Sequence, residues 1–259
     1  MLKKKVPSKK RSIQSYTRSP ALLVEDLSKV IALHPEDAGA YKARGLAYYG
    51  LQNNSKAAVA DLDKAIALQP NDAEAYAHRA VAQMMNGDQA KALADIEQAL
   101  SLDPRLALAH LYRGVIYSTQ GDTERALASL NRALALDPQL GPAYAQRGLI
   151  YNRQGAFDLA IADLDQSLAL DSGNVEAFAY RGLAYGAKGQ LDRAVADLDR
   201  AIALGTRVGS VYYFRGYKHW MDGEKESAIA ALHCALQLPL APENKQSAEK
   251  ILAELQGGA

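Results

Sequence analysis

The chain has 259 residues, of which 49% are hydrophobic and 23% are charged, and its formal net charge at pH 7 is +1. This composition is ordinary for a soluble folded protein, and the single cysteine excludes an intrachain disulfide. No apolar run is long enough to cross a membrane or to act as a signal peptide, so a soluble, cytoplasmic protein is expected.

The first segment of the chain is strongly basic. Residues 1–18 contain seven lysines and arginines and no acidic residue. Removing these seven charges from the net +1 leaves −6 for the rest of the chain, which gives the body no general attraction for nucleic acid. Because short runs of like charge at a chain terminus usually stay unfolded, we expect residues 1–19 to form a disordered basic arm. The alternative is that this arm tethers the protein to nucleic acid or to an anionic membrane.

A repeated unit follows the arm. Six arginines recur at separations of 35, 34, 34, 34 and 34 residues, at Arg44, Arg79, Arg113, Arg147, Arg181 and Arg215. Within each unit an apolar pattern of helical period runs for about 14 residues, breaks at a turn and resumes. Residues 37–240 are thus predicted to hold six helix pairs, which bury their apolar faces by stacking. Residues 20–36 reproduce only the second half of a unit and are predicted to form a capping helix.

The last segment is predicted to cap the array. In residues 241–259, the stretch from Glu243 to Leu255 is amphipathic and places Ala248, Ile251 and Leu252 on one face. We expect this face to cover the sixth unit and the opposite, polar face to meet water.

The period and the repeated positions resemble a known family. Tyr144, Arg147, Gly148, Tyr151 and Ala160, with the 34-residue spacing, are similar to the signature of tetratricopeptide repeats, with arginine where that motif usually has leucine. The resemblance implies an all-α, right-handed superhelix of about six repeats with an N-terminal half-repeat and a C-terminal capping helix. It also implies a protein-binding scaffold rather than an enzyme.

Aspartates recur in the second helices, each 18 residues before one of the arginines. Opposite charges that enter a helix interface are expected to pair, because an unpaired buried charge is costly. Pairing within a unit would leave Asp26 without a partner, whereas pairing with the following unit uses every aspartate. We therefore predict a ladder that fixes the register of stacking; the alternative is a set of independent solvated charges. The predicted pairs are Asp26 with Arg44, Asp61 with Arg79, Asp95 with Arg113, Asp163 with Arg181 and Asp197 with Arg215.

The resemblance also implies a concave groove lined by the first helices. Carried over by alignment, the groove positions lie two before and two, five and six after each arginine. Only Lys42 and Arg153 among them are charged, which favours an apolar or mixed peptide as the ligand. The candidate groove residues are Leu46, Tyr49, Val81, Met84, Met85, Leu111, Val115, Leu149, Asn152, Arg153, Leu183, Tyr213, Tyr217, Trp220 and Met221.

The sixth unit carries an aromatic stripe of Tyr213, Tyr217 and Trp220. Large aromatic side chains on an accessible surface are typical binding anchors, and Gly186 with Ala187 would leave a hollow beside Trp220. The alternative is that the C-terminal helix covers these rings as ordinary core.

No catalytic constellation is present in the sequence. The five histidines are scattered without metal-ligand spacing, and no glycine-rich phosphate loop occurs, so neither a metal nor a cofactor is expected. The sequence favours a non-enzymatic adaptor that holds a partner peptide or helix in the groove. The alternatives are the tether described above and a solenoid that associates with itself; the identity of the partner is not encoded in the pattern.

Overall fold

The computed structural model describes residues 19–51 and 54–257, and the secondary structure of these residues is exclusively helical. The basic segment 1–18, and with it the predicted arm, lies outside the described residues. The predicted all-α superhelix is confirmed. The first helices of the six units are α2 (Ala38–Ala47), α4 (Ala73–Met85), α6 (Ala107–Thr119), α8 (Gly141–Arg153), α10 (Val175–Ala187) and α12 (Gly209–Met221).

The second helices pack against their own first helix and against the helix that follows in the chain, which for the sixth unit is the C-terminal helix. They are α3 (Ser55–Leu68), α5 (Gln89–Leu102), α7 (Thr123–Leu136), α9 (Phe157–Leu170), α11 (Leu191–Ala203) and α13 (Lys225–Leu236). A single helix precedes the pairs, α1 (Pro20–Leu33), and another follows them, α14 (Pro242–Gly257); the short 3-10 helix η1 (Tyr48–Gly50) extends α2. None of the described helices has the length and apolarity that crossing a bilayer requires.

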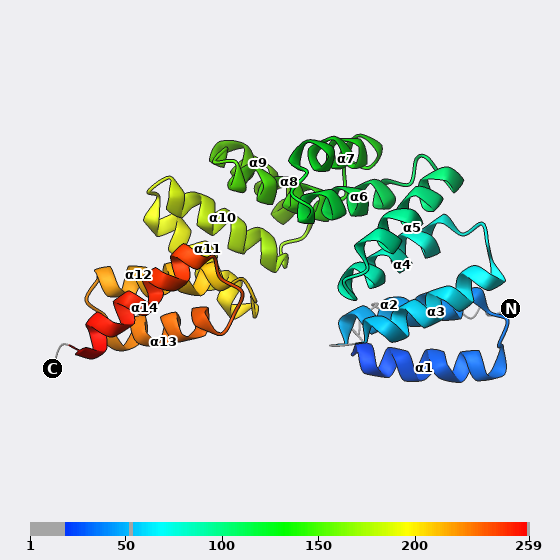
Figure 1. The fold of residues 1–259 in the computed structure, drawn as a ribbon, viewed down its shortest axis with the longest axis horizontal. Helices are drawn as coiled ribbons and strands as arrows, with labels where there is room; N and C mark the ends of the chain where they lie inside the picture. The colour runs from blue at the N-terminus through cyan, green and yellow to red at the C-terminus, as the bar shows by residue number, and fades with distance from the viewer. Residues whose placement is uncertain (1–18, 52–53, 258–259) are drawn as a thin grey trace, which may run out of the picture.

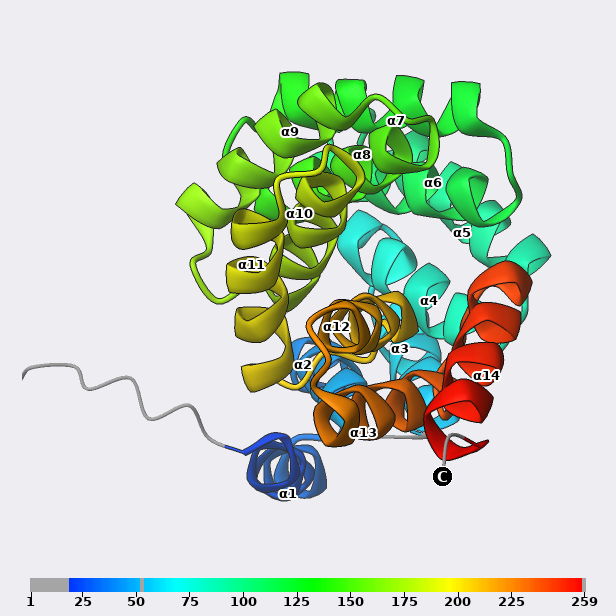
Figure 2. The same ribbon diagram turned by 90° about the vertical axis from the view of Figure 1, so that its left-hand side faces the viewer.

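The pairs wind into a right-handed superhelix. Figure 1 shows α1 and α14 at opposite ends of the array. In Figure 2 the first helices α6, α8 and α10 lie inside the curve, while the second helices α7, α9 and α11 lie outside it. The array therefore has a concave side made by first helices, as the family resemblance implied.

Glycines close the turn between the two helices of a unit. Gly87 has φ +84, a left-handed conformation that carries no steric penalty in glycine. The amide of Asp88 then donates to the carbonyl of Gln83 at 2.9 Å, and so ties off the end of α4. The same conformation recurs at Gly121, Gly155, Gly189 and Gly223.

A second glycine position lets the two helices of a unit approach closely. A Cβ atom on Gly182 would lie 2.8 Å from Cγ of Leu198, a fully buried side chain of α11. In the second unit this position is Ala80, and the facing residue is Ile96 rather than leucine. Isoleucine branches at Cβ, whereas leucine branches at Cγ, and this change of shape leaves room for the methyl group of Ala80.

The predicted pairing of the aspartates with the following unit is wrong. Nε and Nη2 of Arg147 donate to the two carboxylate oxygens of Asp163, both at 2.7 Å, within one unit. The reason is geometric: Asp163 is only 7% exposed on the face of α9 that packs against α8, where the planar guanidinium reaches both oxygens. The same bidentate pair forms in three further units, as Arg44–Asp61, Arg79–Asp95 and Arg181–Asp197.

Neighbouring units are nevertheless joined through the arginines. Nη1 of Arg181 donates to Asp165 of the preceding unit at 2.6 Å, and Nη1 of Arg79 donates to Asp63 at 2.7 Å. Equivalent contacts reach from Arg147 to Asn131, from Arg44 to Ser28 and from Arg215 to Asp199. Each of these inter-unit partners lies two residues after the aspartate predicted to pair with the arginine, or after its equivalent, as Asp165 lies two residues after Asp163. Hydrogen bonds to Asp95 and Asp197 raise the pKa of Arg79 and Arg181 above the ordinary value for arginine.

Candidate functional site

The N-terminal part of the concave side uses its polar groups internally. The hydroxyl of Tyr49 donates to the backbone carbonyl of His78, and the ring of His78 packs edge-on against Tyr112. Burial raises the pKa of Tyr49 and lowers that of His78. Tyr49 therefore joins η1 to α4 rather than offering its hydroxyl to a ligand.

Lys42, one of the two charged groove positions, is paired with carboxylates of the second unit. Burial disfavours its charge, but hydrogen bonds to Asp72 at 2.8 Å and Glu74 at 3.0 Å raise its pKa overall. This lysine is therefore an internal link between the first and second units.

The candidate groove residues differ in how accessible they are. Leu111 is 3% exposed and belongs to the core. Met85 is 56% exposed, and Arg153 is also exposed. Leu46, Val81, Met84, Val115, Leu149, Asn152 and Leu183 are partly buried, as expected of side chains that form the floor of a groove.

The aromatic stripe of the sixth unit is divided between core and surface. Trp220 and Tyr213 pack against Ile251 and Leu252 of α14, and the Tyr213 hydroxyl donates to Ser247 Oγ at 2.9 Å. Tyr217 is 40% exposed, and its neighbour one turn on, Met221, is 62% exposed. The C-terminal helix thus covers two of the three rings.

The hollow expected beside Trp220 is not formed. The ring of Phe214 fills the space next to Gly186, where a Cβ atom would lie 2.7 Å from Phe214 Cζ. The absence of a side chain at Gly186 therefore allows α10 and α12 to pack closely.

A different hollow lies on the concave side of the fourth to sixth units. It has a volume of about 620 Å³ and brings together four of the candidate groove residues, Leu149, Asn152, Arg153 and Leu183. The remaining residues of its lining are Phe157, Tyr180, Arg207, Val208, Gly209, Ser210, Pro239 and Ala241. Helices α8 and α10 thus supply one wall, and the segments on either side of the sixth helix pair supply the other.

The loop before α12 is held in one geometry. Gly205 has φ +81, and the amide of the buried Thr206 donates to the carbonyl of Ala201 at 3.0 Å, which ends α11. The carbonyl of Thr206 accepts from the Tyr212 hydroxyl at 3.2 Å, and its Oγ1 accepts from the amide of Val208 at 3.2 Å. Arg207 is fixed between these two anchored residues, with its side chain exposed at the hollow.

The opposite side of this wall depends on a close backbone contact. A Cβ atom on Gly209 would lie 2.5 Å from the carbonyl oxygen of Pro239. Only glycine therefore lets the segment between α13 and α14 pack against the start of α12 and close the hollow.

Asn152 links the two helices of the other wall. Its Nδ2 donates to the carbonyl of Tyr180 at 2.8 Å, so the amide joins α8 to α10 across the floor. Its Oδ1 is buried and has no hydrogen-bond partner in the part of the chain that the structure describes. Burial raises the pKa of the Tyr180 hydroxyl, which stays protonated at neutral pH.

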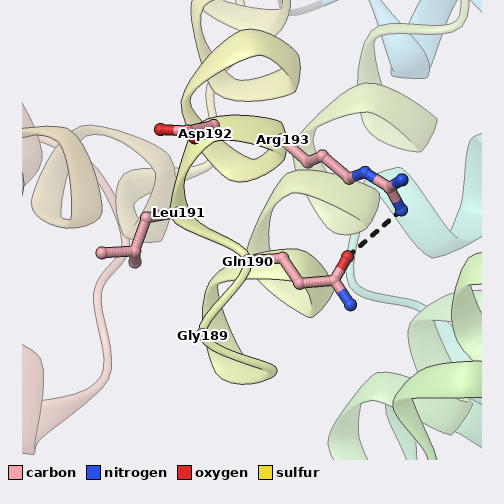
Figure 3. Close-up of a pocket in the computed structure, with 5 residues that line it drawn as sticks. All are labelled: Gly189, Gln190, Leu191, Asp192 and Arg193. Carbon is pink, nitrogen blue, oxygen red and sulfur yellow. Dashed lines mark hydrogen bonds between the residues drawn. The ribbon is translucent and has the colours of Figure 1, made fainter.

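A second hollow, of about 610 Å³, lies against the turn between α10 and α11 and is lined by Gly189, Gln190, Leu191, Asp192 and Arg193. Figure 3 shows Leu191 and Asp192 on one side of the turn and Gln190 with Arg193 on the other. The latter two are joined by a hydrogen bond of 3.3 Å. The side chains diverge, so no set of groups converges on a ligand here. Among the described residues, histidine, cysteine and carboxylate side chains also form no cluster that could hold a metal ion.

The sequence alone did not identify Phe157, Tyr180, Arg207 or Pro239 as site residues. A signal for Arg207 is present in the linkers between units. The first four contain a proline, at residues 35, 70, 104 and 138, whereas the linkers before α10 and α12 contain none, and the latter reads Gly205-Thr206-Arg207-Val208. The two linkers without proline flank the fifth unit, whose residues Tyr180 and Leu183 line the hollow.

Comparisons with known proteins agree with the geometry of the repeat. One family model, described as tetratricopeptide repeat, matches residues 24–73, 79–141 and 180–243. Two further models with the same description match residues 114–173 and 62–94. The search among curated proteins gives no match.

Several solved structures share the fold. The chain is similar to a chain of the APC/C hetero-tetramer Cut9-Hcn1, with 20% identity, a TM-score of 0.78 and coverage of 91% of this chain and 46% of that one. It is also similar to human IFIT1 in a dimer with PPP-AAAA, with 17% identity, a TM-score of 0.73 and coverage of 91% and 59%. The chain thus spans less than two thirds of either protein, and at these identities the similarity shows the fold alone.

Proposed function

Because the chain belongs to the tetratricopeptide-repeat family, we propose that it is a non-enzymatic scaffold that binds a partner peptide or helix on its concave side. Arrays of this family typically serve as protein-interaction scaffolds. The proposal therefore concerns where this particular array takes its partner.

The observation that carries the proposal is the hollow formed by the fourth to sixth units. Its volume of about 620 Å³ falls in the range of about 300–1,000 Å³ that is typical of ligand sites in proteins. Leu149, Leu183 and Phe157 give it an apolar floor, and backbone and amide groups lie at its edge. An apolar floor with a few polar groups suits a peptide that inserts one or two large side chains.

The proposal is tested with peptides of defined origin. A displayed library of random dodecapeptides is panned against the immobilised protein, and enriched sequences are resynthesised for affinity measurements. We expect sequences rich in large apolar residues, whose Kd rises at least about tenfold in Leu149→Ser, since this change removes buried apolar contact area. The matched control is Leu159→Ser, which alters a 55% exposed leucine on α9 and should leave Kd unchanged.

Two results would contradict the proposal. One is a panning experiment that enriches no apolar sequences. The other is a set of enriched peptides that bind Leu149→Ser as tightly as the unaltered protein. Thermal unfolding of both variants shows whether the array has remained folded, and substitution of a second floor residue, Leu183→Ser, repeats the measurement at an independent contact.

A further inference from the structure

The arginines of this protein differ in whether a carboxylate of the array binds them. Five of the six repeat arginines, all except Arg113, bind carboxylates within the array, as Arg147 and Arg181 do at 2.6–2.8 Å. Among the described residues no ion pair joins Arg153 or Arg207 to a carboxylate. Arg132 and Arg200 share this property, but they do not line the hollow, whereas Arg153 and Arg207 do. Within the part of the chain that the structure describes, the Arg153 side chain makes one hydrogen bond, a long one from Nη1 to Ser118 Oγ at 3.4 Å.

Both of these arginines lie at the same hollow, and no acidic residue is among the twelve residues that line it. The two guanidinium groups come from segments far apart in the sequence, the end of α8 and the loop before α12. Their side chains are exposed, so an incoming group reaches their donors without breaking an internal ion pair. The lining of the hollow therefore carries two positive charges and no negative one, in a body that is acidic overall, with a net charge of −6 once the seven basic residues of segment 1–18 are removed from the total of +1.

The start of α12 adds to this positive character. Gly209 and Ser210, the first two residues of the 13-residue helix, line the hollow. Val208 at the N-cap has no side-chain oxygen to accept from the first amides, whereas Asp72 and Asn174 do so at the start of α4 and α10. The amides of the first turn and the helix dipole together favour a negative charge at this end.

The floor of the same hollow is apolar. Leu149, Leu183 and Phe157 form one part of it, and Val208 and Pro239 form another. A ligand that satisfies both features carries a carboxylate and a large apolar group close together. A polyphosphate ligand is disfavoured, because its many charges would face the acidic body beyond the two arginines.

We propose that the hollow selects peptide segments in which an aspartate or glutamate side chain lies next to a large apolar residue. Arg153, Arg207 and the first amides of α12 bind the carboxylate, and the floor around Leu149 and Leu183 takes the apolar side chain. This assignment rests on the proposed scaffold function and names the chemistry of its partner. It also makes Arg207, which stands outside the groove positions of the repeat, a specificity-determining residue.

The test uses a displayed library of random dodecapeptides fused at both ends, so that no free terminal carboxylate is present. The library is panned against the unaltered protein, against Arg153→Gln/Arg207→Gln and against the control Arg132→Gln/Arg200→Gln. The control removes the same charge from two exposed arginines on the second helices α7 and α11. Thermal unfolding confirms that each protein is folded; because all four arginines are exposed, none of the substitutions removes a buried contact.

The unaltered protein and the control should enrich acidic residues adjacent to leucine, isoleucine or phenylalanine. The Arg153→Gln/Arg207→Gln protein should still enrich apolar residues but lose the acidic preference. For a resynthesised peptide, the double substitution should raise Kd at least about tenfold, since charge-assisted hydrogen bonds are lost. Changing the peptide's aspartate to asparagine should raise Kd by a similar factor in the unaltered protein and have little further effect in the double variant.

The outcomes separate the two proposals. Enrichment of apolar residues without acidic ones overturns the assignment of the carboxylate and leaves the scaffold function standing. Failure to enrich apolar residues overturns the scaffold function itself. A single-stranded RNA oligonucleotide that binds more tightly than any selected peptide, and does so through Arg153 and Arg207, also overturns the assignment.

Discussion

Replacing Asp197 by alanine should destabilise the array far more than replacing Asp165, although both carboxylates bind the same arginine. Arg181 donates to Asp197 through Nε and Nη2 at 2.7 and 2.8 Å, and to Asp165 through Nη1 at 2.6 Å. The side chain of Asp197 is 9% exposed, that of Asp165 is 49% exposed and that of Arg181 is 20% exposed. Burial, not distance, therefore distinguishes the two pairs.

The magnitudes follow from this difference. Removing Asp197 leaves a largely buried guanidinium with its main partner gone, which costs about 3–5 kcal/mol in comparable buried pairs. Removing Asp165 breaks a pair with one solvated member, for which about 0–1 kcal/mol is typical. The difference in burial between the two pairs thus predicts that Asp197→Ala costs at least about three times as much stability as Asp165→Ala.

The measurement is urea unfolding monitored by circular dichroism, arranged as two double-mutant cycles that share Arg181→Met as the second substitution. The coupling energy between Arg181 and Asp197 should be about 2–3 kcal/mol, and that between Arg181 and Asp165 should be below about 1 kcal/mol. Equal losses for the two aspartates, or a coupling between Arg181 and Asp197 below about 0.5 kcal/mol, would refute the reasoning.

Gly182→Ala should cost about 1–3 kcal/mol in urea unfolding, because the new methyl group meets Leu198, and adding Leu198→Ile should recover most of the loss; an uncompensated double variant would be inconsistent with this packing. Trp220→Ala should cost about 3–5 kcal/mol and speed amide exchange in α14, since the ring packs under that helix, while peptide binding at the hollow stays unchanged. Burial lowers the pKa of His78, so below pH ~6.5 the unfolded chain binds more protons at this residue than the folded chain does. The contribution of His78 to the free energy of unfolding is therefore complete above that pH and falls below it, by at most about 1.4 kcal/mol per pH unit. His78→Phe should flatten this part of the pH profile between pH 7.5 and 5.5, and a profile as steep as that of the unaltered protein would show that another group is responsible.

The elements of the fold could be predicted from the sequence because every unit repeats the same local signals. The helix pairs, the turn at Gly87 and its equivalents, and the inward face of α14 at Ala248, Ile251 and Leu252 follow from apolar periodicity and glycine placement alone. Signals of this kind need no knowledge of how distant segments meet. Six copies also average out the exceptions, such as Ala80 in the glycine position.

The pairing of the arginines could not be predicted from spacing. Four of the six arginines have a buried carboxylate 16 or 17 residues after them and a more exposed partner 16 residues before them, as with Asp197 and Asp165 around Arg181. Counting how many aspartates find a partner favoured pairing with the next unit. The structure shows that helix packing decides instead, because the deepest carboxylate lies on the face that its own first helix covers.

The position of the hollow follows from what happens to the groove at its two ends. In the first units, Lys42 is held by Asp72 and Glu74, so the polar groups there are already in use. At the other end, α14 covers Tyr213 and Trp220. The stretch between keeps Arg153 and Arg207 available and gains a wall because Gly209 lets the Pro239 segment pack closely. Since that wall consists of residues outside the repeated positions, the departures from the repeat, rather than the repeat itself, make this part of the groove different from the others.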